Sequence, residues 1–88
     1  MEIKQNGTVL LQFSADWCGP CRAMKSTVEQ FQEKTNVIVQ KVNIDTESKI
    51  SAKYGVRSIP CFIVLKDGNQ TKRVVGSQSL NQLLDLVK

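Results

Sequence analysis

The sequence contains no histidine, few aromatic residues and only three cysteines, and each scarcity excludes a class of function. A closed zinc site requires four nitrogen or sulfur ligands, which three cysteines without histidine do not supply. One tryptophan, one tyrosine and three phenylalanines are too few to form a stacking platform for single-stranded nucleic acid. We therefore expect no bound metal and no nucleic-acid partner.

Long apolar runs are also missing. No segment approaches the roughly 18 consecutive apolar residues of a membrane span, and Met1–Gly7 has no apolar core of the kind found in signal peptides. The odd number of cysteines argues against a fully paired, secreted disulfide framework. These absences predict a cytoplasmic protein that does not enter a membrane.

Positive charge is in moderate excess. The chain has twelve Lys and Arg residues and eight Asp and Glu residues, which gives a formal charge of +4, and the basic residues are scattered along the chain. Such a distribution is typical of a solvated surface and at most favours acidic protein partners. A chain of 88 residues has room for one hydrophobic core, so residues 1–88 are expected to form a single domain.

The segment Trp17-Cys18-Gly19-Pro20-Cys21 carries the most reactive chemistry in the chain. An apolar strand at Val9–Ser14 precedes it, and an amphipathic helix from about Pro20 to Lys34 follows. The first turn of a helix has free backbone N–H groups and a partial positive charge, both of which stabilise a thiolate at Cys18. Cys21 falls one turn further on, toward the apolar face. The pattern predicts an exposed attacking sulfur and a shielded second one.

Two thiols at this spacing can form a disulfide, bind a soft metal or pack as inert core residues. The lack of further ligands disfavours a metal, and an Fe–S cluster shared between two chains has no other support in the sequence. A disulfide across so short a loop adds little stability. Redox chemistry is the favoured interpretation.

The remaining elements alternate along the chain. We predict strands at Val37–Ile44, Cys61–Leu65 and Thr71–Val75, the last of them an edge strand because it is more polar. Asn36 is the expected stop of the first helix, and Asp45 or Thr46 the expected cap of a second helix that runs to Lys53. A capping box at Ser79–Gln82 begins a last helix. A further short strand at Glu2–Lys4 is left open. The order is β-α-β-α-β-β-α in an α/β fold, with one mixed sheet because the last two strands are joined by a short turn.

Several segments together resemble the thioredoxin family. Besides Ala15–Cys21, they are Lys41–Asp45, Lys53–Pro60, Lys66–Gly68 and Gly76, and the match runs from about Val9 to the C-terminus. The resemblance implies a thioredoxin fold, a mixed central sheet flanked by helices, with the N-terminal strand and helix shortened or missing. It also implies that Cys18, Gly19, Pro20 and Cys21 form the catalytic segment.

The same resemblance implies a substrate-binding groove. Pro60 would be cis and packed against the dithiol, and Ile59 would offer its backbone to an extended peptide. Trp17 would lie on the surface beside Cys18, although an isolated tryptophan is by default a core residue. Gly76 would line the same apolar groove.

Three residues near the expected site depart from the family or are ambiguous. Thioredoxins usually have an aspartate that assists proton transfer at the position of Gln12, which here needs internal hydrogen-bond partners or water. Lys41 matches the family's lysine and either points inward beside Gln12 or reaches solvent. Cys61 stands where threonine is usual. It is either a buried small apolar residue or a third thiol able to form a regulatory or intermolecular disulfide.

The sequence as a whole predicts a monomeric thioredoxin that reduces protein disulfides. Cys18 would attack the substrate and Cys21 would resolve the mixed disulfide. The resemblance implies re-reduction by a thioredoxin reductase that draws on NADPH or ferredoxin, with no cofactor bound to this chain. Two alternatives remain, a glutaredoxin-like enzyme that uses glutathione and a thioredoxin-fold binding subunit in which the dithiol is incidental.

Overall fold

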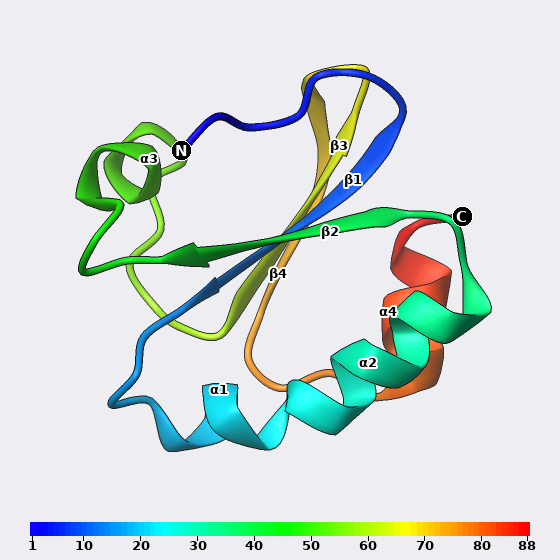
Figure 1. The fold of residues 1–88 in the computed structure, drawn as a ribbon, viewed down its shortest axis with the longest axis horizontal. Coiled ribbons are helices and arrows are strands. Elements are labelled where there is room, and N and C mark those ends of the chain that lie inside the picture. The colour runs from blue at the N-terminus through cyan, green and yellow to red at the C-terminus, as the bar shows by residue number, and fades with distance from the viewer.

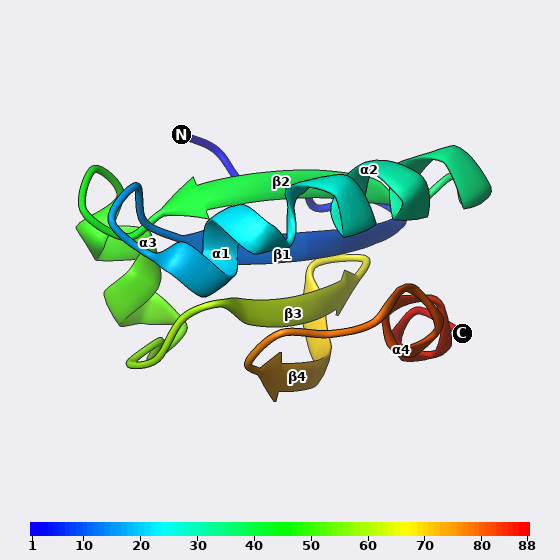
Figure 2. The ribbon, with the colours of Figure 1, turned by 90° about the horizontal axis from the view of Figure 1, so that it is seen from below.

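A mixed four-stranded β-sheet forms the centre of the protein, and all 88 residues are described by the computed structural model (Figure 1). The sheet has the order β2-β1-β3-β4, and Figure 2 shows the four strands side by side in this order from top to bottom. The elements in chain order are β1 (Thr8–Ser14), α1 (Gly19–Ala23), α2 (Lys25–Lys34), β2 (Ile38–Asn43), α3 (Ser48–Lys53), β3 (Cys61–Lys66), β4 (Asn69–Val75) and α4 (Leu80–Leu86).

The strand pairing confirms the predicted mixed sheet. β1 pairs in parallel with β2, because the helices α1 and α2 form the crossover that joins them. β1 pairs antiparallel with β3. β3 and β4 form an antiparallel hairpin, whose tight turn places Asp67 and Gly68 at positive φ angles of 50° and 86°. β4 lies at an edge of the sheet, as its polar sequence predicted.

The first predicted helix is divided into two. α1 ends at Ala23, and α2 begins at Lys25. Between them, the N–H of Met24 bonds to the carbonyl of Cys21 at 3.1 Å, a three-residue step that tightens the last turn of α1. The single helix predicted over Pro20–Lys34 is therefore wrong, since apolar spacing does not report a local change from four-residue to three-residue bonding.

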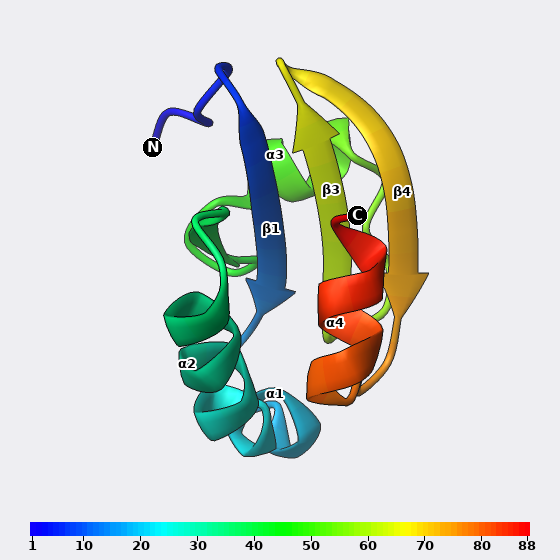
Figure 3. The same ribbon diagram turned by 90° about the vertical axis from the view of Figure 1, so that its right-hand side faces the viewer.

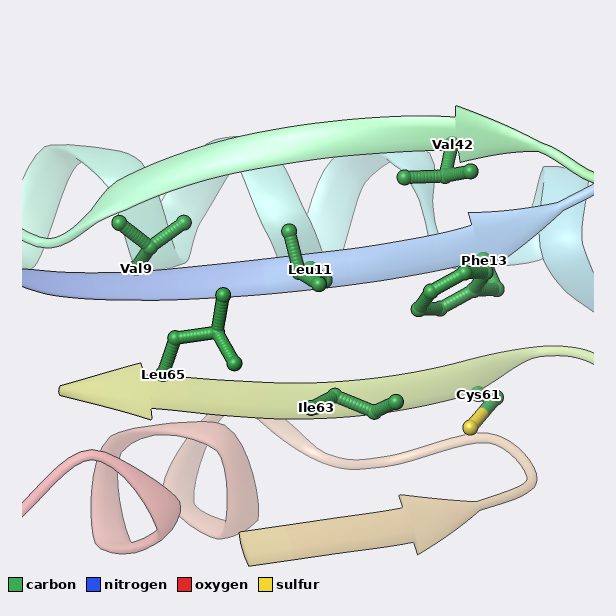
Figure 4. Packing of buried hydrophobic residues seen from close by; sticks show 7 residues of the cluster. All are labelled: Val9, Leu11, Phe13, Val42, Cys61, Ile63 and Leu65. Carbon is green, nitrogen blue, oxygen red and sulfur yellow. The ribbon is translucent and has the colours of Figure 1, made fainter. Parts of the chain in front are cut away.

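Two apolar layers cover the sheet, and Figure 3 shows α2 and α4 in front of it and α3 behind. Alternate residues along each strand point to opposite faces, so neighbours in sequence join different layers. The layer on the α3 side contains Val9, Leu11, Phe13, Val42, Cys61, Ile63 and Leu65 (Figure 4). The layer under α2 and α4 contains Leu10, Met24, Val28, Phe31, Phe62, Val64 and Leu83.

The N-terminal segment lies beside β2 without forming a strand, so the short strand considered at Glu2–Lys4 is absent. The Gln40 side chain holds this segment. Its Oε1 accepts the N–H of Lys4 at 2.8 Å, and its Nε2 donates to the carbonyl of Glu2 at 2.9 Å. Ile3 packs on the layer at the α3 side. A side-chain amide thus takes the place of a backbone ladder at this edge.

The helix ends agree with the sequence at α4 and differ at α2 and α3. Ser79 and Gln82 form the predicted capping box. α2 ends at Lys34, before the expected stop at Asn36. The N-cap of α3 is Glu47, which makes no side-chain cap bond, so the predicted caps Asp45 and Thr46 are wrong. Their N–H groups are instead bonded to Oδ1 of Asn43, at 2.8 and 3.3 Å. None of the helices has the length and apolar character needed to span a membrane.

Candidate active site

A disulfide joins Cys18 and Cys21 at the start of α1, directly after the turn that follows β1. Their Cα atoms are 5.2 Å apart, within the range that a disulfide requires. Cys18 is the N-cap of α1, and its Sγ accepts the backbone N–H of Cys21 at 3.2 Å. Pro20 lies in the first turn, where its missing N–H costs nothing. The sulfur of Cys18 therefore occupies the position in which a helix N-terminus stabilises negative charge.

Both sulfur-bearing residues are buried, in contrast to the predicted difference in exposure. Cys18 is 5% exposed and Cys21 6%. In the oxidised protein the two residues and Ala15 form one small cluster, against which Ile44 and Ile59 pack. The bond between the sulfurs holds them in the same environment, so the expected exposed and shielded pair is wrong for this state. What distinguishes the two is the N–H that Cys18 alone accepts.

The Ile59-Pro60 peptide bond is cis, as the resemblance implied. Ile59 packs against the disulfide cluster. The carbonyl of Pro60 accepts the N–H of Gly76 at 2.8 Å, which joins the end of β4 to this segment. Gly76 has a φ of 98°, a conformation that side-chain-bearing residues rarely adopt. The backbone N–H and carbonyl of Ile59 make no hydrogen bond.

Trp17 lies on the surface, as the resemblance implied, and the alternative of a core aromatic is wrong. Its side chain is 66% exposed, and its indole Nε1–H donates to Oδ2 of Asp45 at 2.9 Å. Sequence reasoning missed this role of Asp45. A signal was present, because Asp45 follows β2, whose C-terminal end meets that of β1 in a parallel pair. Val75, 56% exposed and next to Gly76, is a second apolar residue that the sequence did not single out.

Gln12 is buried beneath the site and is not satisfied. It is 4% exposed, and its Oε1 has no hydrogen-bond partner. Gln12 is the register partner of Lys41 across β1 and β2. Lys41 is exposed, which supports the interpretation in which it reaches solvent. Both line a cavity of about 300 Å³, together with Ser14, Ala15, Asp16, Cys21, Arg22 and Lys25. The cavity gives Cys21 and the amide of Gln12 a shared route to water.

Cys61 is a free thiol inside the apolar layer on the α3 side (Figure 4). Its residue is 1% exposed, which supports the interpretation as a small apolar core residue. Burial raises the pKa of the Cys61 thiol, and the positive charge of Arg73 acts in the opposite direction. The disulfide belongs to a different cluster, so the structure does not bring the three cysteines together as one site.

The fold and the site define a class of protein. A mixed sheet with a disulfide at the start of the helix after a central strand, close to a cis-proline segment from far along the chain, is typical of a thiol–disulfide oxidoreductase with the thioredoxin fold. The disulfide is the redox-active group.

Comparison with known proteins identifies the family. A family model described as Thioredoxin matches residues 1–88. A thioredoxin of Chlamydia caviae is 42% identical over 82 residues, which are 92% of this chain and 80% of the relative. A single-site mutant of a thioredoxin from Halobacterium salinarum superimposes with a TM-score of 0.89 at 40% identity, over 93% of this chain and 73% of the other. A reduced Schistosoma mansoni thioredoxin pre-protein gives 0.87 at 32% identity, covering 94% and 78%.

The chain therefore belongs to the thioredoxin family. It is an oxidoreductase that reduces disulfides through a dithiol–disulfide cycle of Cys18 and Cys21.

Proposed function

We propose that residues 1–88 act as one monomeric, cytoplasmic thioredoxin domain in which Cys18 is the attacking nucleophile and Cys21 the resolving thiol. The observation that carries this assignment is the N–H of Cys21 directed at Sγ of Cys18, 3.2 Å away at the start of α1. A hydrogen bond to a charged group contributes about 1.5–3 kcal/mol, so this contact favours thiolate at Cys18 over Cys21. Gly19 and Pro20 keep the two sulfurs one turn apart.

The reaction is a pair of thiol–disulfide exchanges. The Cys18 thiolate bonds to one sulfur of the substrate disulfide, that disulfide breaks, and the departing substrate thiolate takes up a proton. Cys21 then loses its proton and attacks Sγ of Cys18, which releases the second substrate thiolate, and this thiolate also takes up a proton. The substrate gains two electrons from the dithiol and two protons, one released by Cys21 and one from solvent, and the protein is left with the Cys18–Cys21 disulfide.

An extended substrate segment would bind beside the cis-proline. The backbone N–H and carbonyl of Ile59 are free to pair with a peptide, and Pro60 follows directly on this residue, which packs against the disulfide cluster. Trp17 and Val75 supply exposed apolar surface, and Gly76 leaves space because it has no side chain. These features suit disulfides that lie in flexible or extended protein segments.

Proton transfer at Cys21 would use water instead of a buried acid. Gln12 cannot ionise, yet it lines the cavity into which Cys21 also opens. Water in this cavity would accept the proton of Cys21, while the charge of Lys41 at the same cavity favours the thiolate. Gln12 and Lys41 thus modulate the resolving step without taking part in bond exchange.

Re-reduction requires a partner, because the chain itself carries only the disulfide. We assign this role to a thioredoxin reductase supplied by NADPH or by ferredoxin, with no cofactor held by this protein. The formal charge of +4 would favour a reductase or substrate with an acidic docking surface.

A coupled assay tests the proposal. The oxidised protein is mixed with a protein disulfide and, in parallel, with a purified thioredoxin reductase and its donor or with glutathione and glutathione reductase. Turnover with the thioredoxin reductase alone is expected. Turnover with glutathione alone would indicate a glutaredoxin-like enzyme. Complementation of a host by a Cys18→Ser, Cys21→Ser double variant would indicate a binding subunit in which the dithiol is incidental.

A further inference from the structure

The segment that carries Ile59 and Pro60 is hydrogen-bonded at its ends and not in its middle, because the N–H groups of Tyr54, Gly55 and Val56 bond to carbonyls of α3. It runs from the end of α3 to the start of β3, residues 54–60 (Figure 1). No hydrogen bond involves the backbone of Arg57, Ser58 or Ile59. The position of these residues is therefore set by how the two ends of the segment are held and by side-chain packing.

Both ends are attached to β4. At the far end, the N–H of Gly76 bonds to the carbonyl of Pro60 at 2.8 Å. At the near end, the guanidinium of Arg73 donates to the carbonyl of Tyr54, the C-cap of α3, and to that of Gly55 at 3.4 Å. Carbonyls at a helix C-terminus lack partners within the helix, so Arg73 supplies donors where they are needed.

Arg73 is suited to this role by its shape and by the absence of a competing partner. A guanidinium presents several donors in one plane and can bond two neighbouring carbonyls at once, which an ammonium does less well. The structure contains two salt bridges, and neither involves Arg73. Apart from the carbonyls, its guanidinium donates a hydrogen bond only to Oε1 of Gln70, at 3.4 Å.

The same segment packs on the apolar layer to which Cys61 belongs. Tyr54, Val56 and Ile59 pack against the apolar layer that contains this thiol, which is 1% exposed. Figure 4 shows Cys61 in that layer at the start of β3. If the segment loosened, solvent and reagents would reach Cys61. The chain thus contains its own reporter of segment opening.

We propose that Arg73 is a positioning residue for substrate binding, which fixes residues 54–60 against β4 and so sets Ile59 and Pro60 beside the Cys18–Cys21 disulfide. The inference rests on the proposed function, because it assumes that protein substrates pair with Ile59. Arg73 is exposed, and the loss of a contact that shifts an equilibrium about tenfold is small beside the total stability of a folded domain. Its loss therefore loosens the segment locally without unfolding the domain.

The first test uses the oxidised protein, in which Cys61 is the only free thiol. Labelling by a maleimide is followed by mass for the wild type, Arg73→Gln and Arg73→Lys. Lys72→Gln is the matched control, because Lys72 is an exposed neighbour on β4 without a side-chain hydrogen bond. We expect labelling of Arg73→Gln to be about tenfold faster, since a lost charged hydrogen bond shifts a local opening equilibrium by about that factor. Arg73→Lys should be intermediate and Lys72→Gln unchanged.

The second test separates positioning from packing. In reduction of a protein disulfide, Arg73→Gln should raise KM about tenfold and change kcat less than about twofold, since the sulfur chemistry is intact while the peptide-binding backbone is displaced. Arg73→Lys should restore part of the KM. Thermal melts identify any variant that is globally unfolded. If Arg73→Gln is unfolded, KM and kcat are compared between Arg73→Lys and the wild type.

The outcomes are distinguishable from those of the proposed function. An unchanged labelling rate, or faster labelling with KM unaffected, would overturn the positioning role. A wild-type protein without disulfide-reductase activity would contradict the proposed function, while the labelling result would still report whether Arg73 holds the segment.

Discussion

Cys21 donates its backbone N–H to Sγ of Cys18 at 3.2 Å, a contact that would stabilise a thiolate at Cys18 once the disulfide is reduced. This relationship makes the two thiols chemically unequal although both residues are almost equally buried in the disulfide. Differences between them should therefore appear in the reduced protein as reactivity.

In the reduced protein, Cys18 should be alkylated by iodoacetamide before Cys21, because the thiolate is the reactive form and the helix N-terminus favours it at Cys18. Cys18→Ser should abolish disulfide reduction. Cys21→Ser should still attack and should accumulate mixed disulfides visible by mass spectrometry. Faster alkylation of Cys21 would reverse the assignment of roles.

Gln12→Asp should change the pH dependence of the resolving step. With glutamine, alkylation of Cys18 should follow a single ionisation, since the side chain at position 12 carries no charge. A buried carboxylate there would couple to the thiols and add a second ionisation. It should also accelerate release of mixed disulfides near neutral pH, because Cys21 gains a nearby base.

Gln12→Asn provides the control for this prediction, since it keeps an amide and adds no charge. Two coupled ionisations already present in the wild type, or a Gln12→Asp profile identical to that of Gln12→Asn, would show that position 12 serves packing alone.

Asp45→Ala should release Trp17 from its fixed orientation, because the indole N–H loses its acceptor at 2.9 Å. Trp17 is the only tryptophan, so its fluorescence reports the change directly. We expect a shifted emission spectrum and a several-fold higher KM for protein disulfides, corresponding to the roughly 1 kcal/mol of one hydrogen bond. Asp45→Asn retains an acceptor oxygen and should behave like the wild type. Equal spectra for all three proteins would mean that Asp45 does not orient the indole.

Ionisation of the Cys61 thiol should lower the free energy of unfolding in alkaline solution. Burial raises the pKa of its thiol in the folded protein, so the folded state holds this proton more tightly than the unfolded state does. Stability that depends on the protonated thiol is complete below the unfolded pKa of about 8.5 and is lost as pH rises through the folded pKa. In the oxidised protein, urea unfolding at pH 7 and pH 10 should show a smaller loss for Cys61→Val than for the wild type. An equal loss would mean that the folded and unfolded thiols titrate alike.

The sequence by itself determined the elements whose signals are local. The apolar residues of β1 and β3, the capping box of Ser79 and Gln82, and the Asp67-Gly68 turn all act within a few residues, so their geometry follows from neighbouring side chains. The Trp17–Cys21 segment likewise predicted the redox pair and its place at a helix start. The resemblance of this segment to thioredoxins predicted the cis peptide bond at Pro60.

The tertiary structure alone decided relationships between residues far apart in the chain. Trp17 meets Asp45, and Arg73 reaches the carbonyl of Tyr54, because sheet topology brings separate connections to one end of the molecule. The equal burial of Cys18 and Cys21 depends on Ile59, which packs against them. The side-chain oxygen of Gln12 is unpaired because the fold places no hydrogen-bond donor within its reach. Such contacts depend on long-range packing, and no pattern of local spacing encodes them.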